Sequence, residues 1–147
     1  MIERGPDRNE IVAALVKDDP VDADEHAAQL ATRLETLRTQ FELFQVLVLK
    51  EINRGNDMEA FSYYTAYTLR PLVEALRIKY TPLHYRFFTT YIYFELPREV
   101  NDRLERLYFV GDAKVLAIRR DEAAQWFWEV VTSIDPRGMS ENLGAPL

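Results

Sequence analysis

The stretch DADEHAAQLATRLETLRTQFELFQVLVLKEINRG, residues 22–55, decides the fold. Its apolar residues recur at alternating steps of three and four, which is the period of a helix that buries a narrow stripe against partner helices. The stripe consists of Ala27, Leu30, Leu34, Leu37, Phe41, Phe44 and Val48. Asp22 or Asp24 is suited to cap its start, and Gly55 to end it after Asn53. Such a helix is about 45 Å long at ~1.5 Å per residue, a length found in helical bundles.

The next segment, Asp57–Tyr80, predicts a second helix that carries a proline at its centre. Pro71 removes one backbone donor and its ring clashes with the carbonyl of Tyr67, so we expect a kink at this point. The side facing the core is predicted to consist of Thr65, Leu69, Leu72 and Leu76, flanked by Tyr64, Thr68 and Val73.

Three shorter helices are predicted after Thr81-Pro82. The first covers residues 83–94 and is rich in aromatic residues. The second begins at Leu96-Pro97, and the third is capped by Asp112 and runs to Thr132. Their inward residues are expected to be Val100, Leu104 and Leu107, and then Leu116, Ala123, Phe127, Val130 and Ile134.

No two segments have the pattern of paired strands, although residues 89–94 have a strand-like composition. The expected fold is therefore all-α, an antiparallel bundle of four to five helices with a kinked second helix at Pro71. Residues 1–134 are predicted to form one domain, with a short helix over Asn9–Val16, and residues 135–147 a flexible C-terminal tail.

Composition narrows the classes of function. The formal net charge of −6 argues against nucleic acid as a partner, because nucleic-acid-binding domains are usually basic. Without cysteine the chain has no disulfide and no thiolate metal site. The first residues lack the apolar core of a secretory signal, and the longest apolar run is too short for a membrane span, so we expect a cytoplasmic protein without a membrane partner.

The segment Tyr63–Phe109 contains all eight tyrosines and is mildly cationic, with seven basic and five acidic residues. On the second helix, a polar stripe at steps of four and three comprises Tyr63, Tyr67, Arg70, Glu74 and Arg77. One interpretation is a solvated face on which Glu74 pairs with Arg70 or Arg77. The other is a cleft wall, on which tyrosines stack against a planar small molecule and arginines bind its anionic part.

The following segment adds His84, Tyr85 and Tyr91 to these candidate residues. His84 is suited either to proton transfer or to a structural contact. Arg77 and His84 also resemble the Arg-x6-His motif of HEPN domains, which are helical ribonucleases that need no metal. No nucleophile elbow, zinc-binding helix, glycine-rich phosphate loop or Asp-x-Asp pair is present. The sequence thus predicts no catalytic residue, metal site or cofactor, and leaves open whether the chain is an enzyme.

Two runs, LRPLVEALRIKY (69–80) and LPREVNDRLERLYFV (96–110), resemble the C-terminal helical domain of bacterial nucleotidyltransferases of the kanamycin nucleotidyltransferase-like class. In that family a helical bundle follows a catalytic domain and helps to form the acceptor-substrate side of the cleft. The resemblance covers about residues 41–128. It implies substrate contacts for Arg70, Arg77, Lys79, Tyr80 and Tyr85. The Gly-Ser loop and Asp-x-Asp ligands of the catalytic half are absent.

Three functions follow as expectations. The first is a non-catalytic substrate-binding domain that partners a separate nucleotidyltransferase catalytic subunit, with Tyr67, Arg70, Arg77, Lys79, Tyr80, His84, Tyr85 and Tyr91 lining its site. The second is a structural or interaction protein that forms a homo-oligomer, a dimer, through its tyrosine- and arginine-rich surface. The third is a ribonuclease that uses Arg77 and His84.

Overall fold

The structure is a computed structural model that describes residues 22–135. Within this range it contains helices and no strands, which confirms the all-α prediction. The α-helices are α2 (Ala23–Arg54), α3 (Asp57–Tyr63), α4 (Arg70–Tyr80), α5 (Ile92–Glu95), α6 (Arg98–Tyr108) and α7 (Leu116–Ser133). A π-helical segment, Tyr64–Leu69, joins α3 to α4, and 3-10 turns cover Pro82–Phe87 and Ala113–Val115. The predicted helix over Asn9–Val16 and the tail after Asp135 lie outside the described residues.

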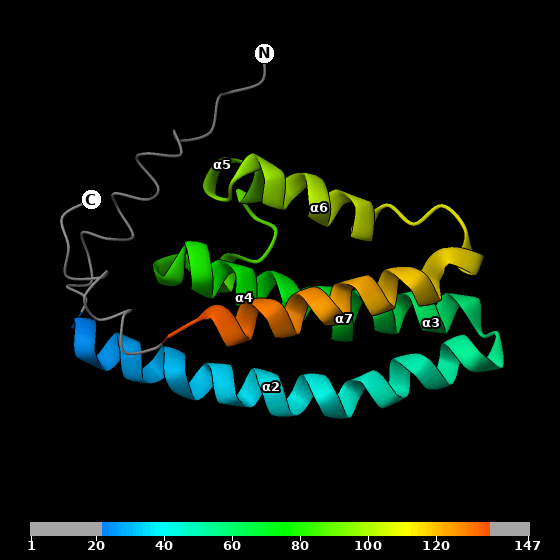
Figure 1. The fold of residues 1–147 in the computed structure, drawn as a ribbon, viewed down its shortest axis with the longest axis horizontal. Coiled ribbons are helices and arrows are strands. Elements are labelled where there is room, and N and C mark those ends of the chain that lie inside the picture. The colour runs from blue at the N-terminus through cyan, green and yellow to red at the C-terminus, as the bar shows by residue number, and fades with distance from the viewer. Residues whose placement is uncertain (1–21, 136–147) are drawn as a thin grey trace, which may run out of the picture.

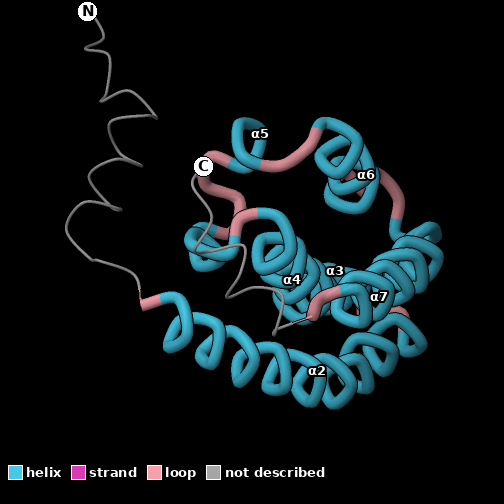
Figure 2. Tube along the Cα trace, turned by 60° about the vertical axis from the view of Figure 1, so that its left-hand side comes forward, coloured by secondary structure: helices cyan, strands magenta, loops and turns pink. Residues whose placement is uncertain are grey.

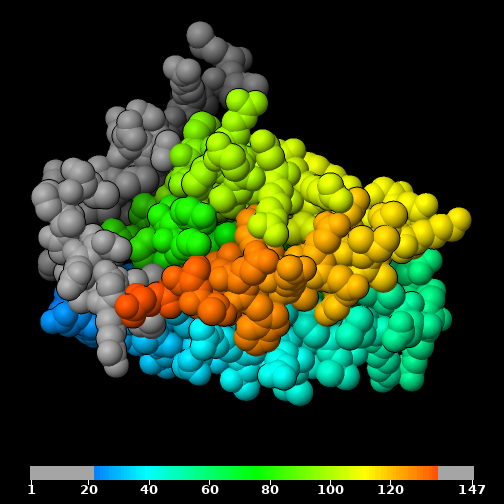
Figure 3. All heavy atoms as spheres, viewed as in Figure 1, coloured from blue at the N-terminus to red at the C-terminus, as the bar shows by residue number. Residues whose placement is uncertain are grey.

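The helices pack in three layers. The long helix α2 forms one outer layer, α4 and α7 lie side by side in the middle with α3, and α5 and α6 form the other outer layer (Figures 1 and 2). Successive long elements run in opposite directions, as the colours of Figure 1 show. In the space-filling view, the side chains of α7 lie between those of α2 and α6 (Figure 3).

Helix α2 begins and ends where the sequence predicts. The carboxylate of Asp22 accepts hydrogen bonds from the backbone N–H groups of Asp24 and Glu25, and Gly55 ends the helix with φ +74°. That left-handed conformation is easiest for glycine. The predicted stripe is buried except at one position. Phe44 is only half-buried, and Gln45 is buried instead.

The second helix continues past Pro71 without a break, through a π-helical segment. The π-helical segment precedes Pro71, and its hydrogen bonds span five residues instead of four, which accommodates the missing backbone donor. The carbonyl of Tyr67, which Pro71 leaves without its helical partner, accepts a hydrogen bond from Nε2 of Gln45 at 3.0 Å. The burial of Gln45 therefore follows from the proline on the neighbouring helix. The widened turn also buries Tyr64 and leaves Thr65 half-exposed, although Thr65 was expected to face the core.

Helix α4 is the centre of the molecule. All seven residues from Leu72 to Ile78 are buried, because α2, α7 and the turn Pro82–Phe87 surround the helix. The prediction of a solvated polar stripe is thus wrong at Glu74 and Arg77, which are 3% and 0% exposed. A sequence pattern cannot distinguish an outward polar stripe from one that is satisfied by neighbouring elements.

The predicted helix over residues 83–94 is wrong in its middle. The chain forms the turn Pro82–Phe87, then passes through Phe88 (φ +50°) and Tyr91 (φ +61°) before the four-residue helix α5. Positive φ values are costly for residues with a β-carbon, so tertiary contacts must maintain them. Those contacts come from Arg77, as described below.

The last two long helices agree well with their predictions. Val100, Leu104 and Leu107 of α6 are buried, and so are Leu116, Ala123, Phe127 and Val130 of α7. Ile134 is half-buried. Of the two tryptophans that were predicted to widen this face, Trp126 is buried and Trp128 is 38% exposed. The rings of Phe41 and Phe127 stack with centroids 3.8 Å apart and join α2 to α7. None of the described helices is long and apolar enough to cross a membrane.

Candidate functional site

Arg77, Glu95 and His84 form a buried polar cluster. One carboxylate oxygen of Glu95 lies 3.1 Å from Nη1 of Arg77, and the other lies 2.7 Å from Nδ1 of His84. The ring of Phe87 stacks on the imidazole of His84 with centroids 4.8 Å apart. The side chains of Arg77, Glu95 and His84 are 0%, 6% and 12% exposed. The structure therefore brings two predicted site residues together, through a glutamate that the sequence did not single out.

The role of Arg77 in this cluster is to fix the backbone after α4. Its guanidinium donates to the carbonyl of Phe88 at 2.9 Å, to the carbonyl of Thr90 and to the hydroxyl of Thr81 at 3.3 Å. These bonds hold the segment that contains the two positive φ values. Because the guanidinium is fully enclosed and engaged, this arrangement does not favour contact between Arg77 and an RNA phosphate.

Glu74 has a different partner from those expected. Nε of Arg33, on α2, donates to both carboxylate oxygens of Glu74 at 3.0 and 3.1 Å, and Nη2 lies 3.0 Å from Oε2. The predicted pairing with Arg70 or Arg77 is therefore wrong. This pairing leaves Arg70 without a carboxylate partner within residues 22–135.

Arg70 is exposed and lies above an aromatic ring. Its guanidinium carbon is 3.9 Å from the centroid of Phe88, a cation–π geometry. The carbonyl of the same Phe88 is held by Arg77, so the buried cluster also positions the ring beneath Arg70. Burial raises the pKa of Tyr108 above its ordinary value, while the nearby charge of Arg70 lowers it.

Arg70 separates two hollows on the surface. The larger, which we call the Arg70 hollow, has a volume of about 570 Å³ and is lined by Phe61, Thr65, Arg70, Phe88 and Tyr108 among others. The smaller, about 200 Å³, includes Tyr67, whose ring stacks on Phe44 with centroids 4.8 Å apart. Arg70, Ala66 and Phe88 line both hollows, so the two lie next to each other.

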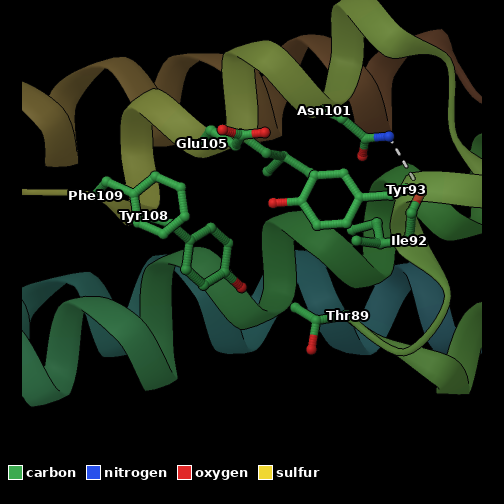
Figure 4. A pocket seen from close by; sticks show the side chains of 8 residues that line it. Thr89, Ile92, Tyr93, Asn101, Glu105, Tyr108 and Phe109 are labelled. Atoms are coloured by element: carbon green, nitrogen blue, oxygen red, sulfur yellow. Dashed lines mark hydrogen bonds between the residues drawn. The ribbon is translucent and has the colours of Figure 1, made fainter.

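A third hollow of about 210 Å³ adjoins the Arg70 hollow through Thr89 and Tyr108. Figure 4 shows that Tyr93 lines it, with the hydroxyl directed toward the space between Tyr108 and the carboxylate of Glu105 on α6. Asn101 and Ile92 also line this hollow, and the side-chain amide of Asn101 donates a hydrogen bond to the carbonyl of Ile92 at 3.1 Å. We refer to these three adjoining hollows together as the groove, and Arg70 lines two of them.

The other predicted site residues lie apart from this groove. Lys79 and Tyr80 are exposed at the end of α4, with the ammonium 5.6 Å from the tyrosine ring. Tyr85 is buried beside His26 and accepts a hydrogen bond from Nε of Arg86 at 3.1 Å. Tyr91 packs near Phe87, away from the lining of the groove. Of the eight predicted residues, Tyr67 and Arg70 line the groove, and Arg77 supports it from within.

Sequence reasoning missed Phe88 and Tyr108 as groove residues. Tyr108 follows the inward residues Leu104 and Leu107 of α6, a position that indicates partial burial. The orientation of Phe88 depends on a positive φ that no local pattern indicates.

Within residues 22–135, no group of three or more histidine, aspartate or glutamate residues is placed to hold a metal ion. Comparison with protein-family models, with curated proteins and with solved structures finds no match.

Proposed function

We propose that this chain is a non-catalytic helical binding domain and that its ligand occupies the Arg70 hollow. The observation that carries the proposal is the state of Arg70, which is exposed, has no carboxylate partner among the described residues and is held above Phe88. An unpaired guanidinium beside aromatic rings is suited to an anionic group attached to a planar ring.

The chemistry around Arg70 supports a small ligand of this kind. A volume of about 570 Å³ lies within the range of small-molecule sites. Phe61, Phe88 and Tyr108 offer ring faces and edges, and Thr65 offers a hydroxyl. No described residue in the hollow combines a nucleophile with a general base, which fits a domain that binds without catalysing a reaction.

The resemblance to the helical domain of nucleotidyltransferases adds a partner to the proposal. In this view, a separate nucleotidyltransferase catalytic subunit would cover the groove, and the ligand would be its acceptor substrate. The ribonuclease alternative has less support, because Arg77 is enclosed in the core.

The proposal can be tested with a planar anion and its two halves. We expect adenosine monophosphate to perturb the NMR signals of the Arg70 hollow, and adenosine or inorganic phosphate alone to bind more weakly. Arg70→Ala should weaken binding about tenfold or more, because a charge-assisted hydrogen bond contributes about 1.5–3 kcal/mol. Arg98→Ala, which changes an exposed arginine at the start of α6, is the matched control. Equal affinity for the nucleotide in the two variants would contradict a role for Arg70.

A further inference from the structure

Helix α2 carries exposed apolar residues. No other described element lies over the outer side of this helix (Figures 1 and 2). Leu43 and Val46 are each 64% exposed and Leu49 is 37% exposed, although they lie on the longest helix of the bundle. The inner side of the same helix already packs against α4 and α7 through the buried stripe. The second half of α2 thus has apolar residues on two sides. One side packs into the core, and the other is exposed.

The exposed stripe is symmetric about Val46. Three residues away on each side are Leu43 and Leu49, and four residues away are Glu42 and Lys50. Seven residues away on each side are the small polar residues Thr39 and Asn53. Spacings of three, four and seven place all of these residues on one face of an α-helix, and all seven are exposed.

We propose that two copies of this chain associate antiparallel through this face of α2, with the twofold axis at Val46. In a twofold interface the same patch faces itself, so the residue at a given distance on one side of the axis meets the residue at that distance on the other side. Val46 then meets Val46 of the second copy. Leucines come to the same level as leucines, and Glu42 comes to the same level as Lys50.

Charge selects this arrangement over a parallel one. A parallel pair in register would place Glu42 beside Glu42 and Lys50 beside Lys50, which repel. The antiparallel pair brings opposite charges together at both ends of the apolar centre, and Thr39 and Asn53 provide a polar boundary. The proposed dimer differs from one formed by the tyrosine-rich segment, in which Tyr64 and Tyr85 are buried in the core. None of the seven residues of this face lines the groove around Arg70, so the dimer is independent of the proposed function.

The first experiment uses the absence of cysteine from the chain. In the variant Val46→Cys, the two thiols of a dimer lie at the twofold axis, so mild oxidation should produce a disulfide-linked dimer at low micromolar protein. Ile118→Cys, which places a thiol at a 56% exposed position on α7, is the matched control and should stay monomeric on denaturing gels. Cross-linking that is equal in the two variants, or absent from Val46→Cys, overturns the proposal.

The second experiment exchanges the charges. Sedimentation velocity over micromolar concentrations should show a dimer for the unchanged chain. Glu42→Lys and Lys50→Glu should each raise the dissociation constant about tenfold, because each brings like charges to the same level. The double variant should restore dimerisation. Circular dichroism controls for folding, which these exposed positions should not affect. A monomeric unchanged chain, single variants without effect, or a double variant without recovery would each overturn the antiparallel arrangement.

Discussion

At the scale of single residues, Tyr64 illustrates how burial changes the chemistry of a side chain. It is fully buried, and its hydroxyl donates to the carbonyl of Leu107 at 2.6 Å. Burial raises the pKa of Tyr64 far above its ordinary value, and the nearby charge of Arg119 opposes this only in part. The hydroxyl therefore stays protonated in the folded protein at a pH where it ionises in the unfolded chain.

This difference predicts a loss of stability in alkaline solution. The contribution of Tyr64 is fully present below the unfolded pKa of about 10 and is lost as the pH rises toward the folded pKa. We expect the free energy of unfolding, measured with urea, to fall as the pH rises above about 10. In Tyr64→Phe the fall should be shallower, while stability at neutral pH should decrease by about 1–3 kcal/mol because the carbonyl of Leu107 loses its donor.

Tyr80→Phe, at a position that is 42% exposed, is the control for this experiment. It should keep both the neutral stability and the alkaline slope of the unchanged protein. If Tyr64→Phe becomes unstable in alkali as steeply as the unchanged protein does, Tyr64 is not the group responsible.

At the scale of elements, Pro71 and Gln45 belong to one feature shared by two helices. The amide of Gln45 donates to the carbonyl of Tyr67, and its side-chain oxygen accepts from the hydroxyl of Thr68 at 3.1 Å. Arg120 of α7 lies 3.4 Å from the same oxygen. A buried glutamine thus satisfies the backbone where the proline interrupts the helix, and links α2, the π-helical segment and α7.

The two residues should therefore be energetically coupled. Gln45→Leu should lower the free energy of unfolding by about 1–3 kcal/mol, because it leaves the part-buried carbonyl of Tyr67 without its donor. Pro71→Ala supplies a backbone N–H for that carbonyl, so the double variant should lose less stability than the sum of the two single variants. Gln29→Leu, at an exposed position on the same helix, should change stability by less than about 0.5 kcal/mol. Strict additivity in urea unfolding would show that the amide does not replace the missing donor.

The accuracy of prediction differed between elements for a physical reason. Helices α2, α6 and α7 have long periodic stripes, and capping residues mark the start and end of α2, so local sequence was sufficient to locate them. The segment 83–94 has no such period, and the bonds that shape it come from Arg77 on another helix. The same limit applied to the candidate site, where Arg70 was found from the polar stripe and Phe88 was not.

At the scale of the whole molecule, the ion pair of Arg77 and Glu95 joins the middle layer to the outer layer that contains α5 and α6 (Figure 1). Both side chains are nearly inaccessible to solvent. Breaking a buried ion pair is costly, because the remaining charge loses its partner in a medium that solvates it poorly.

Glu95→Gln should accordingly lower the free energy of unfolding by about 3 kcal/mol. This value is at the lower end of the cost of breaking a buried ion pair, because Arg77 keeps its bonds to the carbonyls of Phe88 and Thr90. Glu99→Gln, at an exposed position in the first turn of α6, should stay within about 0.5 kcal/mol of the unchanged protein. Urea unfolding followed by circular dichroism measures both. Equal midpoints for the two variants would mean that the pair does not hold the layers together.

The sequence by itself determined the helical class, the extent of α2, the disturbance before Pro71 and the inward faces of α6 and α7. These features depend on interactions within a few residues of one another, where periodicity, capping and the geometry of proline act. Only the tertiary structure decided that Glu74 and Arg77 are buried, that Arg70 lies over Phe88 without a carboxylate partner, and which tyrosines lie in the core, in the groove or elsewhere on the surface. Each of these outcomes depends on which distant side chain supplies a hydrogen bond or a countercharge, and the cost of leaving a buried polar group unsatisfied selects that partner.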